Sequence, residues 1–536
     1  MRLRSLTSPA AWGFLAAPLL VVVGLAVIYL IMAPHSADHA AQTFRTELFE
    51  LSGPTVWNNY WFAGHYLPSY SLLSPPLGAW LGFRVMGSLA VIGTVILFTL
   101  IVRREWGERA QAGAIWFAFA ATISLFSGRL TFALGCLLAM AAVFASQRGL
   151  RIPALLLAGS VGLASPVAAL FLACLGFAHF LAERPDRRGL ELAGVSFLVA
   201  AIVALLFPGG GDEPYVTSSF IPAIGLTLVS AWMVPPGQRL VRTGMLVYAG
   251  ALVASYVLST PMGGNVNRLG ALLLGPVLLC VLAAEPLTPK LWRRGVLIIL
   301  LPMIVWWQTG PVIRDLKLTD DDPAVTQAFY QPLADALEPR LVREPARVEV
   351  VPIASHWEAA RAAPEFPLAR GWERQTDRNY NPLFYADRLG PNRYRQWLDR
   401  LAVGYVALPA DTELDYAGEK EAALIRSGLP FLREIPVGGD WRLFKVIGAQ
   451  PMVARPARLT ELDTDGFAVA APIAGSFEVR IRSTPYWKVK SGFGCVEPGR
   501  GDWTRVTLDR PGSLKVAADF SPGARFGSDR DCRPDR

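Results

Sequence analysis

The chain has 536 residues, of which 52% are hydrophobic and only 18% are charged. Soluble domains carry about 25% charged residues, so the composition excludes a wholly soluble protein. The net charge of +8 does not indicate nucleic-acid binding, because the arginines gather in short loops between apolar runs and form no basic stripe with interleaved aromatics.

Apolar runs occupy the chain up to about residue 310, and many are close to the roughly 20 residues that a membrane-spanning helix needs. We therefore predict a polytopic α-helical membrane protein with about eleven transmembrane helices. The predicted spans are 11–32, 82–102, 111–127, 130–147, 152–165, 166–182, 190–207, 219–234, 243–259, 269–285 and 295–310.

Basic residues alternate between the loops as the positive-inside rule requires. They precede the first span and follow the even-numbered spans, whereas the opposite loops hold few. The residues on the basic side are Arg2, Arg4, Arg103, Arg104, Arg109, Arg148, Arg151, Arg184, Arg187, Arg188, Arg239, Arg242, Lys290, Arg293 and Arg294. We expect the N-terminus in the cytoplasm and, with an odd number of spans, the C-terminal region outside it.

The first outer loop, 33–81, is the longest connection between spans, and long loops in compact proteins tend to be functional. Its start predicts an amphipathic helix through 38–51 that lies in the membrane interface. One face would carry Ala41, Phe44, Leu48 and Leu51, and the other Asp38, Gln42 and Arg45. Asp38 follows the first span closely, so it is a candidate general base; alternatively, these charges simply face water.

Two arginines occupy short outer turns: Arg129 in "FSGRLTFALG" and Arg268 in "STPMGGNVNRLG". A guanidinium suits a lipid phosphate because its planar fork donates two hydrogen bonds at once. The glycines and Asn267 beside them favour tight turns with free backbone N–H groups, which also bind anions. The alternative is that both side chains extend to lipid headgroups.

Aromatic and amide side chains crowd the middle of the same loop. They are Trp57, Asn58, Asn59, Tyr60, Trp61, His65, Tyr66 and Tyr70. Rings that stack on sugar faces and amides that hold hydroxyls suit a sugar or acceptor site, for which we single out Trp57, Asn58, Trp61, His65, Tyr66 and Asn267. Interface aromatics also serve as membrane anchors.

After residue 311 the periodicity is that of a soluble protein. We predict an extracytoplasmic α/β domain over 312–449, with strands at 346–353 and 403–409 and helices at 392–401 and 419–428. Segment 367–385 between the two strands is either a packed surface loop or a lip over the membrane site.

Residues 450–536 read as a β-sandwich, because short strand-like runs alternate with glycine and proline. Cys495 and Cys532 could pair if this region lies outside the cytoplasm. No Cys/His cluster in the sequence suggests zinc.

Several short motifs resemble a family of actinobacterial integral membrane proteins that is similar to the GT-C superfamily of membrane glycosyltransferases. They are "SADHAAQTFRTELF", "SGRLTFALG", "SPVAALFL", "GGNVNRLG" and "FPLARGWERQ". The resemblance implies an inverting glycosyltransferase that uses a polyprenyl-phosphate-linked sugar at the outer face of the plasma membrane, in cell-envelope glycan or glycoconjugate synthesis, with a glycan or lipid as acceptor.

In this family the acid of the first loop is the general base, which corresponds to Asp38 here, and we assign Arg129, Arg268 and Arg45 to the donor phosphate. The chain departs from members with paired acids, since His39 follows Asp38. A divalent metal is therefore left open, with Glu47, Asp212 or Glu213 as candidate second carboxylates. The alternatives are a non-catalytic envelope-assembly protein that binds glycan or lipid, and a transporter or flippase, which the missing inverted repeat disfavours.

Overall fold

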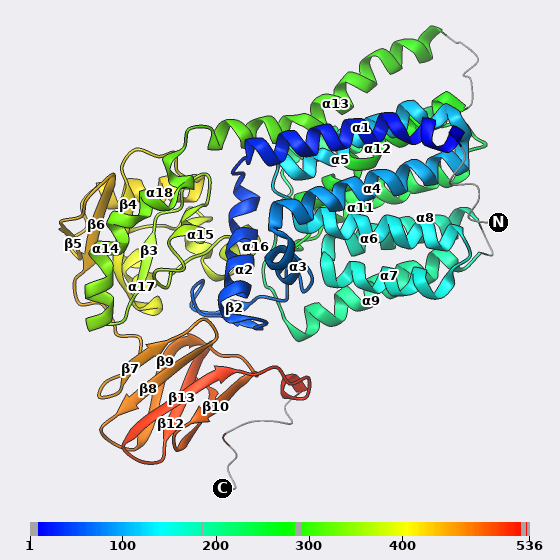
Figure 1. Ribbon diagram of the computed structural model, residues 1–536. Coiled ribbons are helices and arrows are strands. Elements are labelled where there is room, and N and C mark those ends of the chain that lie inside the picture. The colour runs from blue at the N-terminus through cyan, green and yellow to red at the C-terminus, as the bar shows by residue number, and fades with distance from the viewer. Residues whose placement is uncertain (1–8, 184–185, 285–290, 527–531, 533–536) are drawn as a thin grey trace. The chain divides into compact units, whose positions relative to one another are not determined.

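The computed structural model describes residues 9–183, 186–284, 291–526 and 532 (Figure 1). The chain forms two compact units. The first comprises Met1–His39, Tyr70–Leu205 and Asp212–Lys317, and the second comprises Ala40–Ser69, Leu206–Gly211 and Leu318–Arg536. Arg2, Arg4, Arg184 and Lys290, on which the predicted orientation partly rests, lie outside the described residues.

The first unit is a bundle of apolar helices, and each predicted span falls on one of them (Figure 1). They are α1 (Pro9–Met32), α4 (Phe83–Trp106), α5 (Gln111–Phe126), α6 (Leu130–Gln147), α7 (Arg151–Ala164), α8 (Pro166–Ala182), α9 (Arg188–Leu206), α10 (Thr217–Met233), α11 (Arg239–Val257), α12 (Asn267–Ala284) and α13 (Leu291–Thr319). α13 continues past the predicted domain boundary at residue 311, because the charges after Pro311 end the apolar run without ending the helix.

By length and apolar composition, seven segments of the described residues are candidates to cross a membrane, and one of them, Phe83–Phe126, contains both α4 and α5. Helices α7, α8 and α10 are apolar but shorter. The chain is thus a multi-pass membrane protein, while the number of crossings and their orientation stay predictions.

Small residues let these helices approach closely. A side chain at Gly113 of α5 would collide with Cys280 and the Pro276 carbonyl of α12, and one at Gly135 of α6 would collide with Ala168 of α8. Close backbone approach at glycine and alanine is how helices gain packing energy in a bilayer, where burial from water contributes little.

The first predicted loop forms α2 (Ala37–Ser52), the short antiparallel pair β1 (Trp57–Asn58) and β2 (His65–Tyr66), and α3 (Ser74–Leu81). The helix predicted over 38–51 is confirmed, and its place in the membrane interface stays a prediction. Ala41, Phe44 and Leu48 of its predicted apolar face pack into the protein core of the second unit, whereas Leu51 is exposed. Gln42 and Arg45, expected to face water, are buried as well.

The second unit contains a mixed sheet in the order β3-β4-β6-β5. Its strands are β3 (Arg347–Val350), β4 (Val403–Pro409), β5 (Leu432–Ile435) and β6 (Trp441–Val446), with only β3 and β4 parallel. The accompanying helices are α14 (Gln327–Arg343), α15 (Glu358–Arg361), α16 (Arg374–Tyr380), α17 (Pro391–Leu401) and α18 (Tyr416–Arg426). The two strands and two helices predicted for this region are confirmed. Asp415 caps α18 by accepting a hydrogen bond from the Ala417 N–H.

Two antiparallel sheets follow, in the orders β10-β13-β8-β7 and β11-β12-β9. Their strands are β7 (Arg458–Leu462), β8 (Gly466–Ala471), β9 (Gly475–Arg482), β10 (Trp487–Ser491), β11 (Gly494–Pro498), β12 (Trp503–Leu508) and β13 (Gly512–Ala518). Alternate residues such as Phe477, Val479 and Ile481 on β9 are buried, as expected for a two-sheet core. Cys495 of β11 and Cys532 form a disulfide.

Candidate functional site

The start of α2 and the turn between α5 and α6 pack tightly together. Gly128 in this turn has a left-handed backbone with φ of 68°, and a side chain there would collide with Ser36 and His39. Only glycine fits both constraints. This close approach brings Arg129, the next residue, beside the first turn of α2, where Asp38 lies.

Asp38, Arg129 and Arg268 form a charge cluster. Oδ2 of Asp38 lies 3.2 Å from Nε of Arg129 and 3.5 Å from Nη2 of Arg268. The side chains of Asp38, Arg129 and Arg268 are 34%, 25% and 18% exposed, so a ligand has access to them. Three predicted site residues from well-separated segments thus come together in the first unit.

Both arginines pair with the same oxygen of Asp38, and each guanidinium has several N–H donors, so donors remain for an anion. Arg129 precedes α6, and Arg268 lies in the first turn of α12. Asn267, predicted to bind sugar, accepts a hydrogen bond from the Tyr215 hydroxyl at 2.5 Å. This bond fixes the turn that carries Arg268.

A further acid of the cluster was not predicted. Asp315 of α13 interacts electrostatically with Asp38, Arg129 and Arg268. The sequence held a signal that could have identified Asp315: an acidic residue within an apolar helix usually marks a functional site. Among the predicted second carboxylates, Glu213 interacts with Arg268, whereas Glu47 pairs with Arg361 at 3.5 Å in the second unit.

Arg45, predicted to bind the donor phosphate, instead forms a buried ion pair with Glu373. Its guanidinium also lies 5.3 Å from the ring centroid of Trp61. Because Arg45 is only 3% exposed and is paired with a carboxylate, its geometry favours a structural role.

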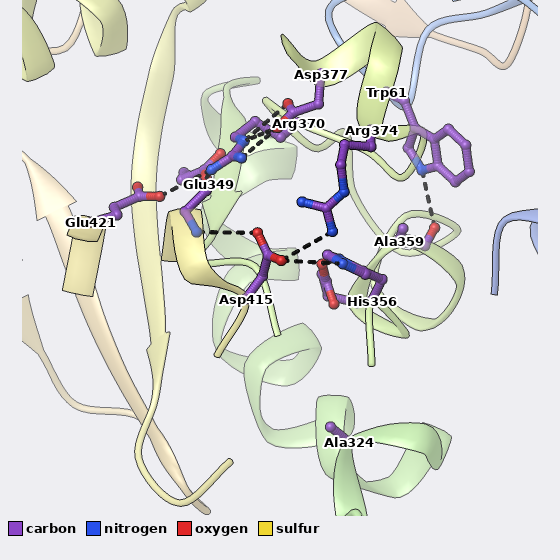
Figure 2. A network of polar contacts seen from close by, with 12 residues as sticks. Trp61, Ala324, Glu349, His356, Ala359, Arg370, Arg374, Asp377, Asp415 and Glu421 are labelled. Carbon is purple, nitrogen blue, oxygen red and sulfur yellow. Dashed lines mark hydrogen bonds and ion pairs between the residues drawn. The ribbon is translucent and has the colours of Figure 1, made fainter. Parts of the chain in front are cut away.

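The residues predicted to hold sugar in the first loop are also buried. Trp57, Asn58, Trp61, His65 and Tyr66 are each less than 9% exposed. The Trp61 indole donates to the Ala359 carbonyl at 3.0 Å (Figure 2). Its ring also stacks on that of His65. Burial lowers the pKa of His65 to about 3, with the positive charge of Arg45 adding to the effect. Their packing favours a core role over sugar binding.

The second unit holds a buried network built from Arg370, Asp377, Glu349 and Glu421 (Figure 2). Nη2 of Arg370 lies 2.5 Å from Asp377, and Nη1 lies 3.3 Å from Glu421 and 3.7 Å from Glu349. Burial raises the pKa of Glu421 to about 7 and that of Glu349 well above its usual value. Buried ion pairs of Arg370 and Asp377 therefore anchor segment 367–385 in the second unit, which favours the prediction of a packed surface loop.

A second polar group lies where the parallel strands end. Nδ1 of His356 is 3.5 Å from Glu358, and Nε2 is 3.8 Å from Asp415. Figure 2 shows Asp415 between His356 and Arg374, whose Nη2 lies 3.2 Å away. Burial alone would raise the pKa of Asp415, but His356 and Arg374 outweigh it and hold that pKa below its usual value.

The described residues contain no group of three or more His, Cys, Asp or Glu side chains that could hold a metal ion. In the charge cluster, two arginines occupy the positions beside Asp38 that further ligands would need. These residues do not fit a divalent cation, which prefers several oxygen ligands.

No family model and no curated protein matches the chain. It is similar over 96% of its length to the class 2 cryo-EM structure of a mutant arabinofuranosyltransferase AftD from mycobacteria, with 13% identity and a TM-score of 0.45. The class 1 structure of the same mutant is similar over 93% of the chain, with 13% identity and a TM-score of 0.43. The chain spans 60% and 59% of those two chains. At 13% identity and with TM-scores below 0.5, this likeness supports no conclusion about the family or the reaction of the chain.

Proposed function

We propose that the protein is a membrane glycosyltransferase that moves a sugar from a polyprenyl-phosphate donor to a hydroxyl acceptor at the outer face of the membrane. The observation that carries the proposal is the placement of Asp38 within 3.5 Å of both Arg129 and Arg268. A base next to two phosphate-binding cations is the minimum that displacement of a lipid phosphate requires.

Asp38 is the general base in this proposal. Its carboxylate takes the proton of the acceptor hydroxyl as the hydroxyl oxygen attacks the anomeric carbon. The bond between that carbon and the phosphate oxygen breaks, and the electron pair leaves with the lipid phosphate. Attack from the side opposite the leaving group inverts the anomeric configuration, and proton removal by a positioned base contributes about 10²- to 10⁴-fold.

Arg129 and Arg268 hold the leaving phosphate, where negative charge develops. Arginine matches phosphate geometry with paired donors, and such donors act most strongly where charge appears in the transition state. In the unliganded protein the same cations pair with Asp38. A bound phosphate competes for them and frees the carboxylate to accept a proton, so donor binding activates the base.

The orientation with the C-terminal region outside the cytoplasm has independent support. Cys495 and Cys532 form a disulfide, and such bonds persist mainly in oxidising compartments. The predicted distribution of basic loops points the same way. Labelling of these two thiols in intact cells after reduction by a membrane-impermeant agent tests this orientation; labelling only after cell lysis would contradict it.

Purified protein in lipid should be incubated with a panel of polyprenyl-phosphate sugars and a glycan extract as acceptor. We expect a product whose new glycosidic bond has the anomeric configuration opposite to that of the donor, as read by NMR. Donor binding without transfer from any lipid-linked sugar would contradict catalysis and favour a non-catalytic glycan- or lipid-binding protein.

A further inference from the structure

Arg84 lies in the first turn of α4. Its guanidinium interacts with Tyr29 of α1, with Cζ 5.6 Å from the ring centroid, and no carboxylate of the described residues interacts with it. An arginine within a membrane-spanning segment is costly unless it is compensated, and uncompensated cases mark functional positions.

The side chain of Arg84 is partly buried. Its Nη1 is fully buried without a hydrogen-bond partner, and the guanidinium rests on Tyr29, whose side chain is completely buried. The Tyr29 hydroxyl is buried beside it and interacts with the guanidinium, but this neutral partner does not compensate the positive charge of Arg84. A snorkelling arginine would direct its donors outward to water, so this geometry indicates donors held for an anion.

The backbone around Arg84 adds further donors. α4 begins after Gly82, which provides no side-chain cap. The first N–H groups of a helix lack intrahelical acceptors, and together with the helix dipole they favour a negative group. The helix end thus adds donors beside a partly buried cation with which no carboxylate of the described residues interacts.

The surroundings indicate that the anion belongs to a lipid. Val85 and Leu89, on the same helix as Arg84, are 40% and 51% exposed, and Trp80 of α3 is 79% exposed. Such apolar exposure on a membrane helix faces hydrocarbon chains. A phosphate on a lipid places its charge at the membrane surface and its chains beside these residues.

We propose that Arg84, Tyr29 and the N-terminus of α4 form a second anion site that binds the phosphate group of a membrane lipid. The site is close to the charge cluster, because Phe83 stacks on His39 and Tyr29 contacts Phe126. It uses none of the residues assigned to transfer, and it does not depend on the proposed reaction.

The test is a thermal-stability titration of purified protein in dodecyl maltoside with three probes: dodecyl phosphate, inorganic phosphate and dodecanol. Wild-type protein should be stabilised by dodecyl phosphate at concentrations about tenfold lower than Arg84→Gln requires, since a charge-assisted hydrogen bond is lost. Inorganic phosphate and dodecanol should have little effect.

Arg104→Gln is the matched control, because Arg104 is an exposed arginine at the opposite end of α4; it should respond like wild type. Tyr29→Phe keeps the buried ring and should lose about threefold in apparent affinity, which preserves the test if Arg84→Gln fails to fold. Equal responses of wild type, Arg84→Gln and Tyr29→Phe to dodecyl phosphate would overturn the site. An equal response of wild type to inorganic phosphate would overturn its assignment to a lipid.

Discussion

Oδ2 of Asp38 lies 3.2 Å from Nε of Arg129, although the two residues are 91 positions apart in sequence. Both side chains remain partly exposed, so this pair differs from the buried ion pairs of the second unit. A partly solvated carboxylate that shares its cation with an incoming phosphate can be released when the phosphate binds.

Arg129→Gln and Arg268→Gln should each weaken binding of a polyprenyl-phosphate sugar about tenfold, because each removes one charged donor to the phosphate. Equilibrium binding to the protein in nanodiscs measures the dissociation constant. Arg104→Gln serves as control and should bind like wild type. Unchanged affinity in both variants would return the two arginines to a role at the lipid surface.

Asp315→Asn should tighten donor binding several-fold, because it removes a negative charge that interacts with Arg129 and Arg268. The same binding assay tests this, with Asp186→Asn in a loop between α8 and α9 as a control carboxylate. Weaker binding in Asp315→Asn would mean that this acid supports the site instead of opposing the anion.

The sequence predicted the positions of the apolar helices well, since a long apolar run has few other stable arrangements. It also singled out Asp38, Arg129 and Arg268, because charges next to apolar runs are few; the structure places these residues together, and their roles stay predictions. It did not predict the partner of Arg45, which is 328 residues away in sequence, nor the protein core that covers α2. Asp315 was missed because the charges near Lys317 look like the end of a span, whereas α13 continues through them.

The stability of the protein should fall as pH rises from about 5 to 7. The folded state raises the pKa of Glu421 from 4.5 to about 7 through burial, so the folded protein holds a proton that the unfolded chain releases. This bound proton stabilises the folded state by about 3 kcal/mol below pH 4.5, and the stabilisation is lost as the pH rises through 7.

Thermal unfolding of the full chain in detergent at several pH values measures this effect. Glu421→Gln cannot titrate and should give a flatter dependence, while the exposed Glu434→Gln should follow wild type. A wild-type melting temperature that rises over this pH range would contradict the assignment.

The buried pair of Arg45 and Glu373 should be far more sensitive to mutation than an exposed pair. Glu373→Gln leaves the Arg45 charge buried and uncompensated, which costs about 3–5 kcal/mol, and the double variant Arg45→Met with Glu373→Met should recover most of that loss. Glu434→Gln breaks the exposed pair with Arg442 and should cost at most about 1 kcal/mol. Denaturant unfolding measures the free energy of unfolding of all three variants. Equal losses of stability in Glu373→Gln and Glu434→Gln would show that Arg45 and Glu373 do not form a buried ion pair.

The most direct measurement is the initial rate of sugar transfer by Asp38→Asn at saturating donor, alongside donor affinity. We expect a rate at least about 10³-fold below wild type, because the amide cannot accept the proton. Donor affinity should be unchanged or tighter, because Arg129 and Arg268 are freed for the phosphate. Asp186→Asn should transfer at the wild-type rate. Transfer by Asp38→Asn at the wild-type rate would contradict the central claim that Asp38 is the base.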